Sequence, residues 1–525
     1  MKTIFLSLGH RSSLFRPGLR PFLWFILVAA SCRKQTQEMS SKELKTAANV
    51  LYYYVDGTNG NDKNDGQSLS TAWKTIQQSF TAATPGSVVA IRGGTYQEQL
   101  TVKVSGTAGN PITFTNYNSE QVIIDGSKNT GTVIITIADR SFLYFRNLTI
   151  RNITKNNAMG IYVSASATGG SNSLTFRNLI VKNINWTAST ATTPNDNDNA
   201  QAFIAYGYGG TQASAITNLT IDSCEFTGNI TGFSESVSVD GNVDTFNITN
   251  NKVHDNSNIG IAAEGNYGTS KTAALDHARN GFIGHNICFN NNAAYATSGG
   301  IYVDGGQHIK VEGNLCYQNG YGIEVGNEQN GSASNITVAD NLIYLNQVSG
   351  LAIGGYDTKT TGQVLNCVIR NNTFIQNNTN GDGSGEMDIT KASNCTFENN
   401  IFYTNKENTL FSLEPITPQA GNHLNYNCWF TAGGDPANIN VNWLNNGYSS
   451  FADYRTGTGQ DANSLFADPL LVQLVFPSPD LHLKTGSPCI QKGDLSLITD
   501  PLETDYDGKP RIVNGKVDMG AYEIQ

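Results

Sequence analysis

The sequence has few charged residues, and no dense run of basic residues occurs beyond its first 34 positions. Only 14% of the 525 residues are charged, and the formal net charge is −10. Nucleic-acid binding needs a basic face, so this composition argues against a nucleic-acid partner. The same charge disfavours a polyanionic substrate, unless a local basic patch or a bound cation offsets the field.

Cysteine is also scarce. The chain has eight, and none lies in a Cys-x-x-Cys motif or in the Cys/His spacing of a zinc site. Two pairs occupy equivalent positions in successive sequence repeats: Cys288 with Cys316, and Cys367 with Cys395. Stacked positions lie close enough for disulfides. Buried thiols that fill the core are the alternative that we favour.

No apolar run is long enough for a comfortable transmembrane helix. Arginines in the first twenty positions precede a short apolar run over residues 22–30, which is typical of a signal peptide. Small residues then lead to Cys32, a pattern that resembles a bacterial lipobox, although Ala29 stands where leucine is usual. We therefore interpret residues 1–32 as a lipoprotein-type signal peptide.

This interpretation predicts lipidation of Cys32 and a membrane contact through that lipid anchor. Residues 33–50 are polar and are expected to form a tether. The protein would then be exported and held at the outer membrane or cell surface, or lie in the periplasm. Ordinary secretion with cleavage near Cys32 is the alternative.

A repeat of roughly 30 residues runs through the chain. Its mark is two asparagines five positions apart, set between short alternating strands such as 336–338 and 342–344. Alternation turns one apolar face inward, and asparagine at a bend tolerates left-handed backbone and can bond a stacked neighbour. The pairs are Asn147/Asn152, Asn178/Asn183, Asn251/Asn256, Asn286/Asn291, Asn314/Asn319, Asn341/Asn346, Asn372/Asn377 and Asn400/Asn405.

This repeat resembles that of the pectin-lyase-like right-handed parallel β-helix superfamily, over about residues 50–430. Residues 52–76 resemble the N-terminal cap of secreted β-helix enzymes, which implies a helix over 71–81 that covers the open end. Its N-cap would be Ser70 or Thr71. The acidic cluster between Asp56 and Asp65 suggests calcium or, as we favour, a set of Asx turns.

The tail over residues 505–523 resembles a C-terminal segment common on such proteins. We therefore predict an all-β fold, a right-handed parallel β-helix over 51–430 with an N-terminal helical cap. Residues 431–525 are expected to form a closing segment packed on the helix. A leucine-rich solenoid is disfavoured because its leucine signature is missing. We expect a monomer.

Acidic residues recur on the strand that precedes the asparagine bend. In 237–240, 261–264, 301–304 and 323–326 the apolar residues alternate inward, so the remaining side chains form outward columns. Stacked carboxylates at about 4.8 Å repel, and need a proton, a cation or a substrate to compensate. One column holds Asp240, Glu264 and Asp304, and the column beside it holds Ser238, Ala262, Tyr302 and Glu324.

Asp304 and Glu324 lie diagonally on adjacent coils, which suits the paired carboxylates of glycoside hydrolysis. Their segments resemble the strands that carry the catalytic residues of β-helical β-xylosidases. That resemblance implies Asp304 as nucleophile and Glu324 as acid/base, although the inserted β-sandwich of those enzymes is missing. We predict a glycoside hydrolase of plant or algal polysaccharide or oligosaccharide, with Asp304, Glu324, Glu264 and Asp240 as catalytic candidates and no required cofactor.

A long insertion over residues 265–280 follows Glu264 directly and could wall the cleft. Arg279 could hold a sugar carboxylate or orient Glu264, and Tyr302 could stack on a sugar ring. Glu235, His254 and Asp255 are outer candidates. The expected substrate-binding residues are Tyr302, Arg279, Asp276, His277, Lys271 and Glu328.

Two other functions remain open. A calcium-dependent polysaccharide lyase would use the acidic column as its calcium cage and a Lys or Arg as base. The column itself has neither, and only Lys271 and Arg279 on the insertion could supply one. A non-catalytic glycan-binding or adhesive surface protein would explain the Asn/Gly/Thr-rich surface. Such a protein would have no reason to gather like charges in one column. An outward row of aromatic residues would favour glycan binding, but beyond Tyr302 the sequence shows no such row.

Overall fold

The computed structural model describes residues 50–355 and 360–525. Tyr52–Gln525 forms one compact unit. The predicted signal peptide, nearly all of the tether and Cys32 lie outside the described residues, so lipidation stays a prediction. Within the described part, no helix is both long and apolar enough to cross a membrane.

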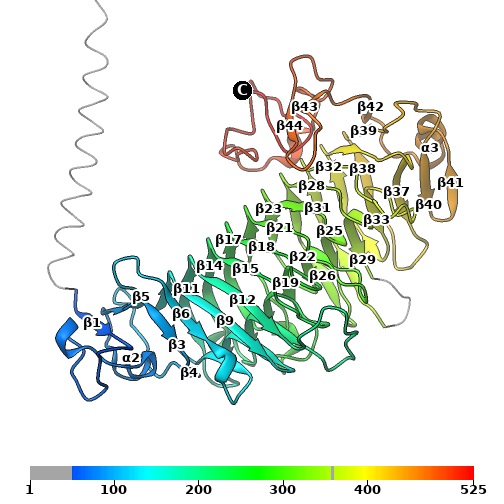
Figure 1. Ribbon diagram of the computed structural model, residues 1–525. Helices are drawn as coiled ribbons and strands as arrows, with labels where there is room; N and C mark the ends of the chain where they lie inside the picture. Colours follow the sequence, from blue (N-terminus) through cyan, green and yellow to red (C-terminus); the bar gives the residue numbers. More distant parts are fainter. Residues whose placement is uncertain (1–49, 356–359) are drawn as a thin grey trace, which may run out of the picture. The chain divides into compact units, whose positions relative to one another are not determined.

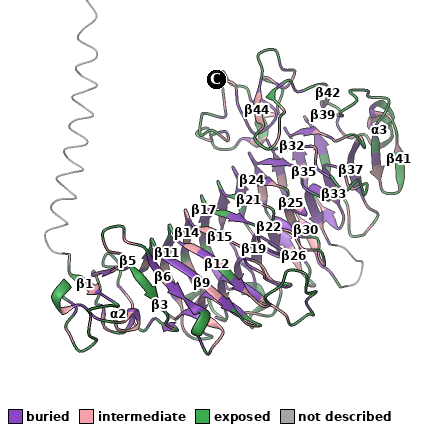
Figure 2. Cartoon of the chain, viewed as in Figure 1, coloured by how far each residue is buried: buried purple, intermediate pink, exposed green. Residues whose placement is uncertain are grey.

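Three long sheets of 13 strands each build the unit Tyr52–Gln525 (Figure 1). Except in the antiparallel pairs β40–β41 and β43–β44, consecutive strands of the chain fall in different sheets, and each strand pairs in parallel with its counterpart one coil away. Every coil therefore adds one strand to each sheet, which confirms the predicted right-handed parallel β-helix. Because the strands alternate, the apolar side chains of all three sheets meet in one continuous interior. Figure 2 shows in purple that buried residues run along these strands.

The sheet that carries the acidic columns is called the site sheet below. It consists of β4 (Leu100–Thr101), β7 (Val133–Ala138), β10 (Ala158–Ala165), β13 (Ala200–Gly207), β16 (Val237–Gly241), β19 (Ile261–Glu264), β22 (Gly299–Asp304), β25 (Tyr321–Gly326), β29 (Ser349–Gly354), β33 (Met387–Ile389), β37 (Thr409–Leu413), β40 (Asn440–Trp443) and β41 (Asn446–Tyr448), in that order.

The second sheet begins at the N-terminal strand. It consists of β1 (Tyr52–Val55), β2 (Val88–Ile91), β5 (Ile112–Asn116), β8 (Leu143–Arg146), β11 (Ser171–Arg177), β14 (Ile216–Asp222), β17 (Val243–Thr249), β20 (Phe282–Gly284), β23 (Lys310–Glu312), β27 (Thr337–Ala339), β31 (Val368–Arg370), β35 (Thr396–Glu398) and β38 (His423–Asn425).

The third sheet consists of β3 (Gly94–Tyr96), β6 (Val122–Asp125), β9 (Thr149–Thr154), β12 (Ile180–Asn185), β15 (Glu225–Thr227), β18 (Lys252–His254), β21 (Ile287–Phe289), β24 (Leu315–Tyr317), β28 (Leu342–Tyr344), β32 (Thr373–Ile375), β36 (Ile401–Tyr403), β39 (Cys428–Phe430) and β42 (Leu465–Phe466). Small sheets are formed by β26 (Ser332–Ser334), β30 (Gln363–Leu365) and β34 (Ala392–Ser393), and by β43 (Leu471–Gln473) and β44 (Asp480–Leu483).

The cysteines occupy the positions that the repeat predicts. Cys288 lies opposite Cys316 across β21 and β24. All seven cysteines of the described residues are buried and unbonded, so they fill core positions as thiols in this structure. Apolar side chains stack in the same way, for example Phe145 on Phe176 with ring centroids 5.3 Å apart.

Two different kinds of asparagine mark the repeat. The early members Asn147, Asn152, Asn178 and Asn183 are left-handed bend residues with φ between 52° and 62°. From Asn251 onward the first asparagine of each pair is instead buried, and Oδ1 of Asn286 accepts hydrogen bonds from the main-chain N and Nδ2 of Asn251. The left-handed residue is then the one before it, for example Asn250, His285, Gly313 and Asp340.

The buried asparagines form two continuous ladders. Asn341 is typical, because its Oδ1 accepts from the main-chain N and Nδ2 of Asn314 at 2.8 and 3.0 Å. Its own main-chain N and Nδ2 donate to Asn372 Oδ1 at 3.0 and 2.8 Å. The second ladder ends on a buried carboxyl group, since Asn377 donates to Glu386. Each coil is thus tied to the next inside the protein.

The N-terminal helix begins later than the sequence predicts. Helix α2 spans Ile76–Ala82 with Thr75 as its N-cap, not Ser70 or Thr71. Residues 69–71 form a 3-10 turn, and Trp73 remains extended because it pairs with β1 and stacks on Tyr53. Phe80 of α2 packs on Phe114 in the core, with ring centroids 4.7 Å apart.

The acidic N-terminal cluster forms turns, as the favoured alternative predicts. Asp56 accepts hydrogen bonds from the amides of Thr58 and Asn59, and Asp65 accepts from the amide of Gln67. These are Asx turns, in which the carboxylate is used by the backbone.

The parallel ladders continue past the predicted boundary at residue 430. β40 pairs with β37 and β42 pairs with β39, and helix α3 (Phe451–Thr458) lies between them in the chain. The remaining segment covers the outer face of the third sheet, where Leu481 and Met519 join Ile375 and Ile401 in a second apolar cluster.

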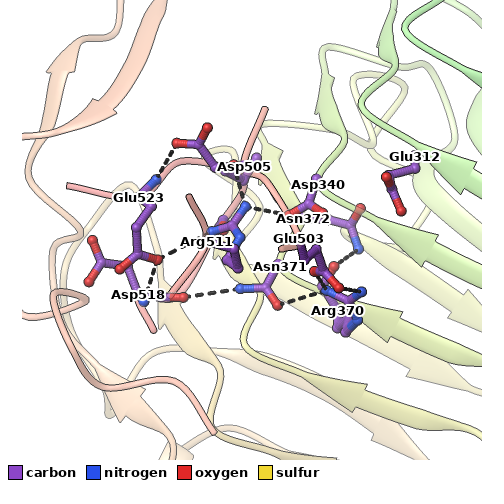
Figure 3. A network of polar contacts seen from close by, with 12 residues as sticks. Glu312, Asp340, Arg370, Asn371, Asn372, Glu503, Asp505, Arg511, Asp518 and Glu523 are labelled. Atoms are coloured by element: carbon purple, nitrogen blue, oxygen red, sulfur yellow. Dashed lines mark hydrogen bonds and ion pairs between the residues drawn. The ribbon is translucent and has the colours of Figure 1, made fainter. Parts of the chain in front are cut away.

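Buried ion pairs attach this C-terminal segment to the coils (Figure 3). The guanidinium of Arg511 is fully buried and contacts the carboxylate of Asp340 and, at 3.6 Å, that of Glu523. Arg370 binds Glu503 through both nitrogens, at 2.6 and 2.9 Å. Such fork-like pairing fixes the orientation of the segment as well as its position.

The asparagine ladder predicts how much stability is lost when one of its asparagines is replaced. Asn341→Ala should lower the free energy of unfolding by about 2–3 kcal/mol, because several buried partners lose their bonds. Asn438→Ala, at an exposed loop position, should change it by less than about 0.5 kcal/mol. Denaturant unfolding of both variants measures the difference. Equal effects would show that the ladder does not hold the coils together.

Candidate functional site

The strand register places the acidic residues in the predicted columns. Asp240 lies opposite Glu264 across β16 and β19, and Tyr302 lies opposite Glu324 across β22 and β25. Asp304 follows in the first column, because Ala263 lies opposite Val303 and the main-chain N of Gly265 donates to the Asp304 carbonyl at 2.7 Å. The sequence therefore identifies which side chains stack.

The column that contains Asp240 and Asp304 is covered by the protein, although the sequence predicts that it faces solvent. Asp240 and Asp304 are 3% and 2% exposed, respectively. The hydroxyl of Tyr267, on the insertion, contacts the Asp304 carboxylate, and Thr269 Oγ1 donates to Asp240 Oδ2 at 2.5 Å. The insertion thus lies across the first column and roofs it between these two carboxylates.

Most of the predicted binding residues on this insertion have structural partners instead. Arg279 forms an ion pair with Asp244 at 3.2 Å and hydrogen bonds with Gln212 and Asn242 at 2.9 Å each. It is 8% exposed, so the prediction that it holds a sugar carboxylate or orients Glu264 is not supported.

Asp276 and His277 also serve the loop. Asp276 accepts from the amides of Gly268 and Ser270 at 2.6 and 2.7 Å, which folds the insertion back on itself. His277 is buried, and desolvation and the nearby Arg279 lower its pKa. Lys271 is exposed at the edge of the insertion. The structure therefore brings neither Asp276 nor His277 to an open surface.

A pocket opens on the site sheet at the C-terminal side of this roof. Glu324 and Asp388 line it, together with Glu328, Tyr302 and Tyr321. Tyr302 is 4% exposed and packs on Ile259 and Ala262, so it offers little ring surface for the predicted stacking on a sugar. Tyr321 is half-buried.

The floor of this pocket holds two carboxylates in one column. Glu324 lies opposite Ala352, and Ala352 lies opposite Asp388 on the next coil. Two coil spacings separate Glu324 and Asp388, which places their Cα atoms about 10 Å apart. The small side chain of Ala352 between them leaves room for a bound molecule. Asn327 lines the same pocket, and its buried Nδ2 has no hydrogen-bond partner among the described residues.

Sequence reasoning missed Asp388. Its strand is short, Met387–Ile389, and the intervening coil carries alanine where Glu324 has its carboxylate. The alternation of Met387, Asp388 and Ile389 was the available signal. Glu235, an outer candidate, is half-buried, and the charges of Glu328, Asp304 and Asp240 help to raise its pKa. His254 and Asp255 do not face the columns, since they lie on the third sheet and bind each other at 2.7 Å.

Burial and mutual repulsion raise the pKa values of these acids. The pKa of Glu324 is well above its ordinary value of 4.5, mainly because burial removes water from its carboxyl group. Repulsion from Glu328, Asp304 and Asp388 raises this pKa further. Desolvation and the nearby Glu414 and Asp382 raise the pKa of Asp388 to about 7. For Asp304, desolvation and Glu328 raise the pKa, while the Tyr267 hydroxyl and the Glu328 amide lower it.

The remaining acids behave in the same way. Desolvation raises the pKa of Glu264 and of Glu235, and the carboxylates of Asp240 and Asp304 contribute repulsion to both. No ion pair joins Glu235, Asp240, Glu264, Asp304, Glu324, Glu328 or Asp388 to a cationic side chain within residues 50–355 and 360–525. In the same ranges, no group of three or more His, Cys, Asp and Glu side chains is arranged to hold a metal ion.

No family model matches the chain. The uncharacterized protein YwoF of Bacillus subtilis is 35% identical over 436 residues, which cover 80% of this chain and 88% of YwoF. The chain belongs to the YwoF family. Pectate lyase PEL9 of Emericella nidulans is 33% identical over 87 residues, which cover 15% of this chain and 21% of the lyase.

Solved structures share the fold at low sequence identity. The structure of XylC with xylose matches with a TM-score of 0.50 and 10% identity, over 75% of this chain and 86% of XylC. Pectate lyase Pel9A matches with a TM-score of 0.47 and 14% identity, over 92% of this chain and 98% of the lyase. Together with the three long parallel sheets, the likeness to XylC shows that the chain has the parallel β-helix fold that the repeat predicts.

The raised pKa of Asp388 predicts a pH-dependent stability. Between pH 3.8 and about 7 the unfolded chain has released a proton that folded Asp388 still holds, so stability falls as the pH rises through this window. Asp388→Asn removes the titrating group and with it this loss of stability at higher pH. The variant should gain about 1–2 kcal/mol of unfolding free energy near pH 8, after allowance for solvent screening, and gain nothing near pH 4. Thermal unfolding at both pH values, with the exposed-site variant Asp435→Asn as control, tests the sign.

Proposed function

We propose that the protein is a glycoside hydrolase whose reaction takes place in the pocket between Glu324 and Asp388. The supporting observation is the pair itself, two carboxylates two coils apart with only Ala352 between them. Inverting glycosidases hold their carboxyl groups about 6.5–9.5 Å apart, which leaves room for water on the far side of the sugar. Side chains whose Cα atoms lie about 10 Å apart in one outward column can place their carboxyl groups within that range.

The environments of the two groups suggest their roles. Burial and three acidic neighbours raise the pKa of Glu324, which favours the protonated form that can donate a proton to the leaving oxygen. Asp388 has a pKa of about 7 and can act as the base that activates water once it is ionised. Tyr321 and Asn327 flank the pocket and can position the sugar. The acid limb of the kcat/KM profile should then lie near pH 7.

Asp304 becomes a positioning residue in this scheme. It is nearly inaccessible and is held by the Tyr267 hydroxyl and by the Glu328 amide at 2.8 Å. Its charge helps to keep Glu324 protonated. Asp304 as the nucleophile, as the β-xylosidase resemblance implies, remains the competing assignment.

A polysaccharide lyase is the second candidate. The similarity to pectate lyase PEL9 over 87 residues favours it. Elimination from a uronate needs a base and a positive charge or metal ion near the sugar carboxylate. The pocket residues are acidic or neutral, and Arg279 is already bound to Asp244, so hydrolysis fits the described residues better.

Export and a lipid anchor at Cys32 complete the proposal. Such an anchor would place the enzyme at the outer membrane or cell surface, where a polysaccharide or oligosaccharide could reach it. We expect the catalytic unit to act as a monomer, without a required cofactor.

Substitution of the pair tests the assignment. Glu324→Gln and Asp388→Asn should each lower kcat by about 10²- to 10⁴-fold, because each removes a proton-transfer group while keeping the shape of the pocket. Asp304→Asn should lower kcat less and shift the pH profile, since it acts through Glu324. Turnover of a glycan panel, followed by new reducing ends, measures the effect. Full activity in either of the first two variants contradicts the assignment.

The products separate the two enzyme classes. Hydrolysis gives new reducing ends without ultraviolet absorbance, whereas elimination gives an absorbing unsaturated uronate. Proton NMR of the first product formed should show an inverted anomeric configuration. An absorbing product would support the lyase, and a retained configuration would favour Asp304 as the nucleophile.

A further inference from the structure

The connections that lead from the third sheet into the site sheet differ greatly in length. After β24 and β28 the chain turns within residues 318–320 and 345–348 before it enters the site sheet. The connections on the coils at either side, residues 290–298 and 376–386, are much longer. Two short turns between two long loops leave a hollow at the corner of the β-helix, beside the coils of β25 and β29.

This hollow, called the corner groove below, has a volume of about 410 Å³. Ligand pockets of proteins typically measure about 300–1,000 Å³. Tyr295 and Thr297 line the groove from the first loop, Gly320 and Gln347 from the short turns, and Asn380 from the second loop. Two further hollows share Gln347 and Asn380 with it, so the groove continues along the edge of the third sheet and has room for several sugars.

Both walls of the corner groove are held by the protein itself. The main-chain N of Asn380 donates to the carbonyl of Gln347 at 2.9 Å, which ties the second loop to the floor. On the opposite wall the hydroxyl of Tyr295 donates to the carbonyl of Gly232 at 3.0 Å, and its ring packs edge-on against Phe233. A groove that is formed before its ligand arrives loses little conformational freedom on binding.

The lining of the groove is polar but uncharged. Gln347 and Asn380 are exposed, and their side-chain amides form no hydrogen bond within residues 50–355 and 360–525. An amide both donates and accepts hydrogen bonds, as a sugar hydroxyl does. None of the described residues that line the groove is charged, so a uronate carboxylate would find no cationic partner there.

The corner groove lies next to the catalytic pocket. Gly320 lines the groove, and the following residue, Tyr321, lines the catalytic pocket beside Glu324. A second path from the pocket, along the column toward the N-terminus, is obstructed because Tyr267 lies over Asp304. A sugar chain held in the pocket can therefore extend across the corner of the β-helix.

We propose that the corner groove binds uncharged sugars of a glycan chain whose scissile bond lies in the catalytic pocket. This inference rests on the proposed glycoside hydrolase and narrows its substrate to neutral glycans of several sugars. The amides of Gln347 and Asn380 bond sugar hydroxyls, and the half-buried ring of Tyr295 packs against an apolar sugar face.

Binding of chains of different length to a catalytically inactive variant tests the groove separately from the reaction. Glu324→Gln is titrated by calorimetry with xylohexaose, mannohexaose and laminarihexaose, with the disaccharide of each, and with a galacturonate hexasaccharide. At least one neutral hexasaccharide should bind about tenfold or more tightly than its own disaccharide, with little effect of added salt. The galacturonate hexasaccharide should bind at least about tenfold more weakly than that neutral hexasaccharide.

Substitutions in the groove locate this length dependence. Adding Gln347→Ala and Asn380→Ala to the inactive variant should reduce the ratio of hexasaccharide to disaccharide affinity to about threefold or less. The matched control adds Gln67→Ala and Asn438→Ala, which remove an exposed glutamine from the N-terminal cap and an exposed asparagine from the C-terminal part. The control should keep the full ratio. Thermal unfolding of each variant checks that the fold is kept.

Three results would overturn the groove as a sugar site. They are the failure of all three neutral hexasaccharides to bind more tightly than their disaccharides, a preference for the galacturonate hexasaccharide, and an unchanged ratio after substitution of Gln347 and Asn380. The proposed function survives any of them if Glu324→Gln abolishes turnover. If the length dependence is found and depends on the groove residues but Glu324→Gln keeps full turnover, the groove stands and the catalytic assignment fails.

Discussion

The hydrogen bonds between stacked asparagines fix the distance from one coil to the next, and the rest of the structure depends on that distance. Each buried asparagine bonds the backbone and the amide of its neighbour, so the spacing cannot vary without loss of several bonds. The outward residues inherit the same spacing. The sheet therefore works as a rigid support on which side chains several coils apart keep a fixed separation.

That rigidity explains how the protein keeps so many acids together. In a flexible loop, repelling carboxylates would move apart, whereas here the parallel ladders hold Asp240 against Glu264 on neighbouring strands. The repulsion is relieved by protonation instead, as the raised pKa values of Glu264, Glu324 and Asp388 show. A raised pKa favours the protonated form of a carboxyl group, which is the state that a general acid requires.

The fold was predictable because its signal is repeated. Asparagine pairs and alternating strands give many copies of one pattern, so the β-helix and the stacking of Asp240, Glu264 and Asp304 follow from sequence alone. The buried cysteine columns follow for the same reason, whereas the Asx turn at Asp56 follows from the local turn preference of aspartate. The start of α2 was not predictable in this way, because the pairing of Trp73 with β1 overrides a local preference for helix.

The site was harder to predict because it depends on what covers the columns. A sequence shows that Asp304 points outward, but not that Tyr267 folds over it. It shows Arg279 on an insertion near acids, but not that Asp244, Gln212 and Asn242 already occupy its guanidinium. Asp388 was missed since a single short strand carries no repeat of its own.

The contacts that Arg279 makes within the protein also affect the choice between hydrolysis and elimination. A lyase needs a positive charge where the uronate binds. The sequence places Arg279 on an insertion beside an acidic column, so from sequence alone Arg279 could supply that charge. Once Arg279 is committed to Asp244, the described pocket has donors and acids but no free cation, so a sugar carboxylate would enter a negative field. Hydrolysis requires only the two carboxyl groups that the coil spacing already holds apart.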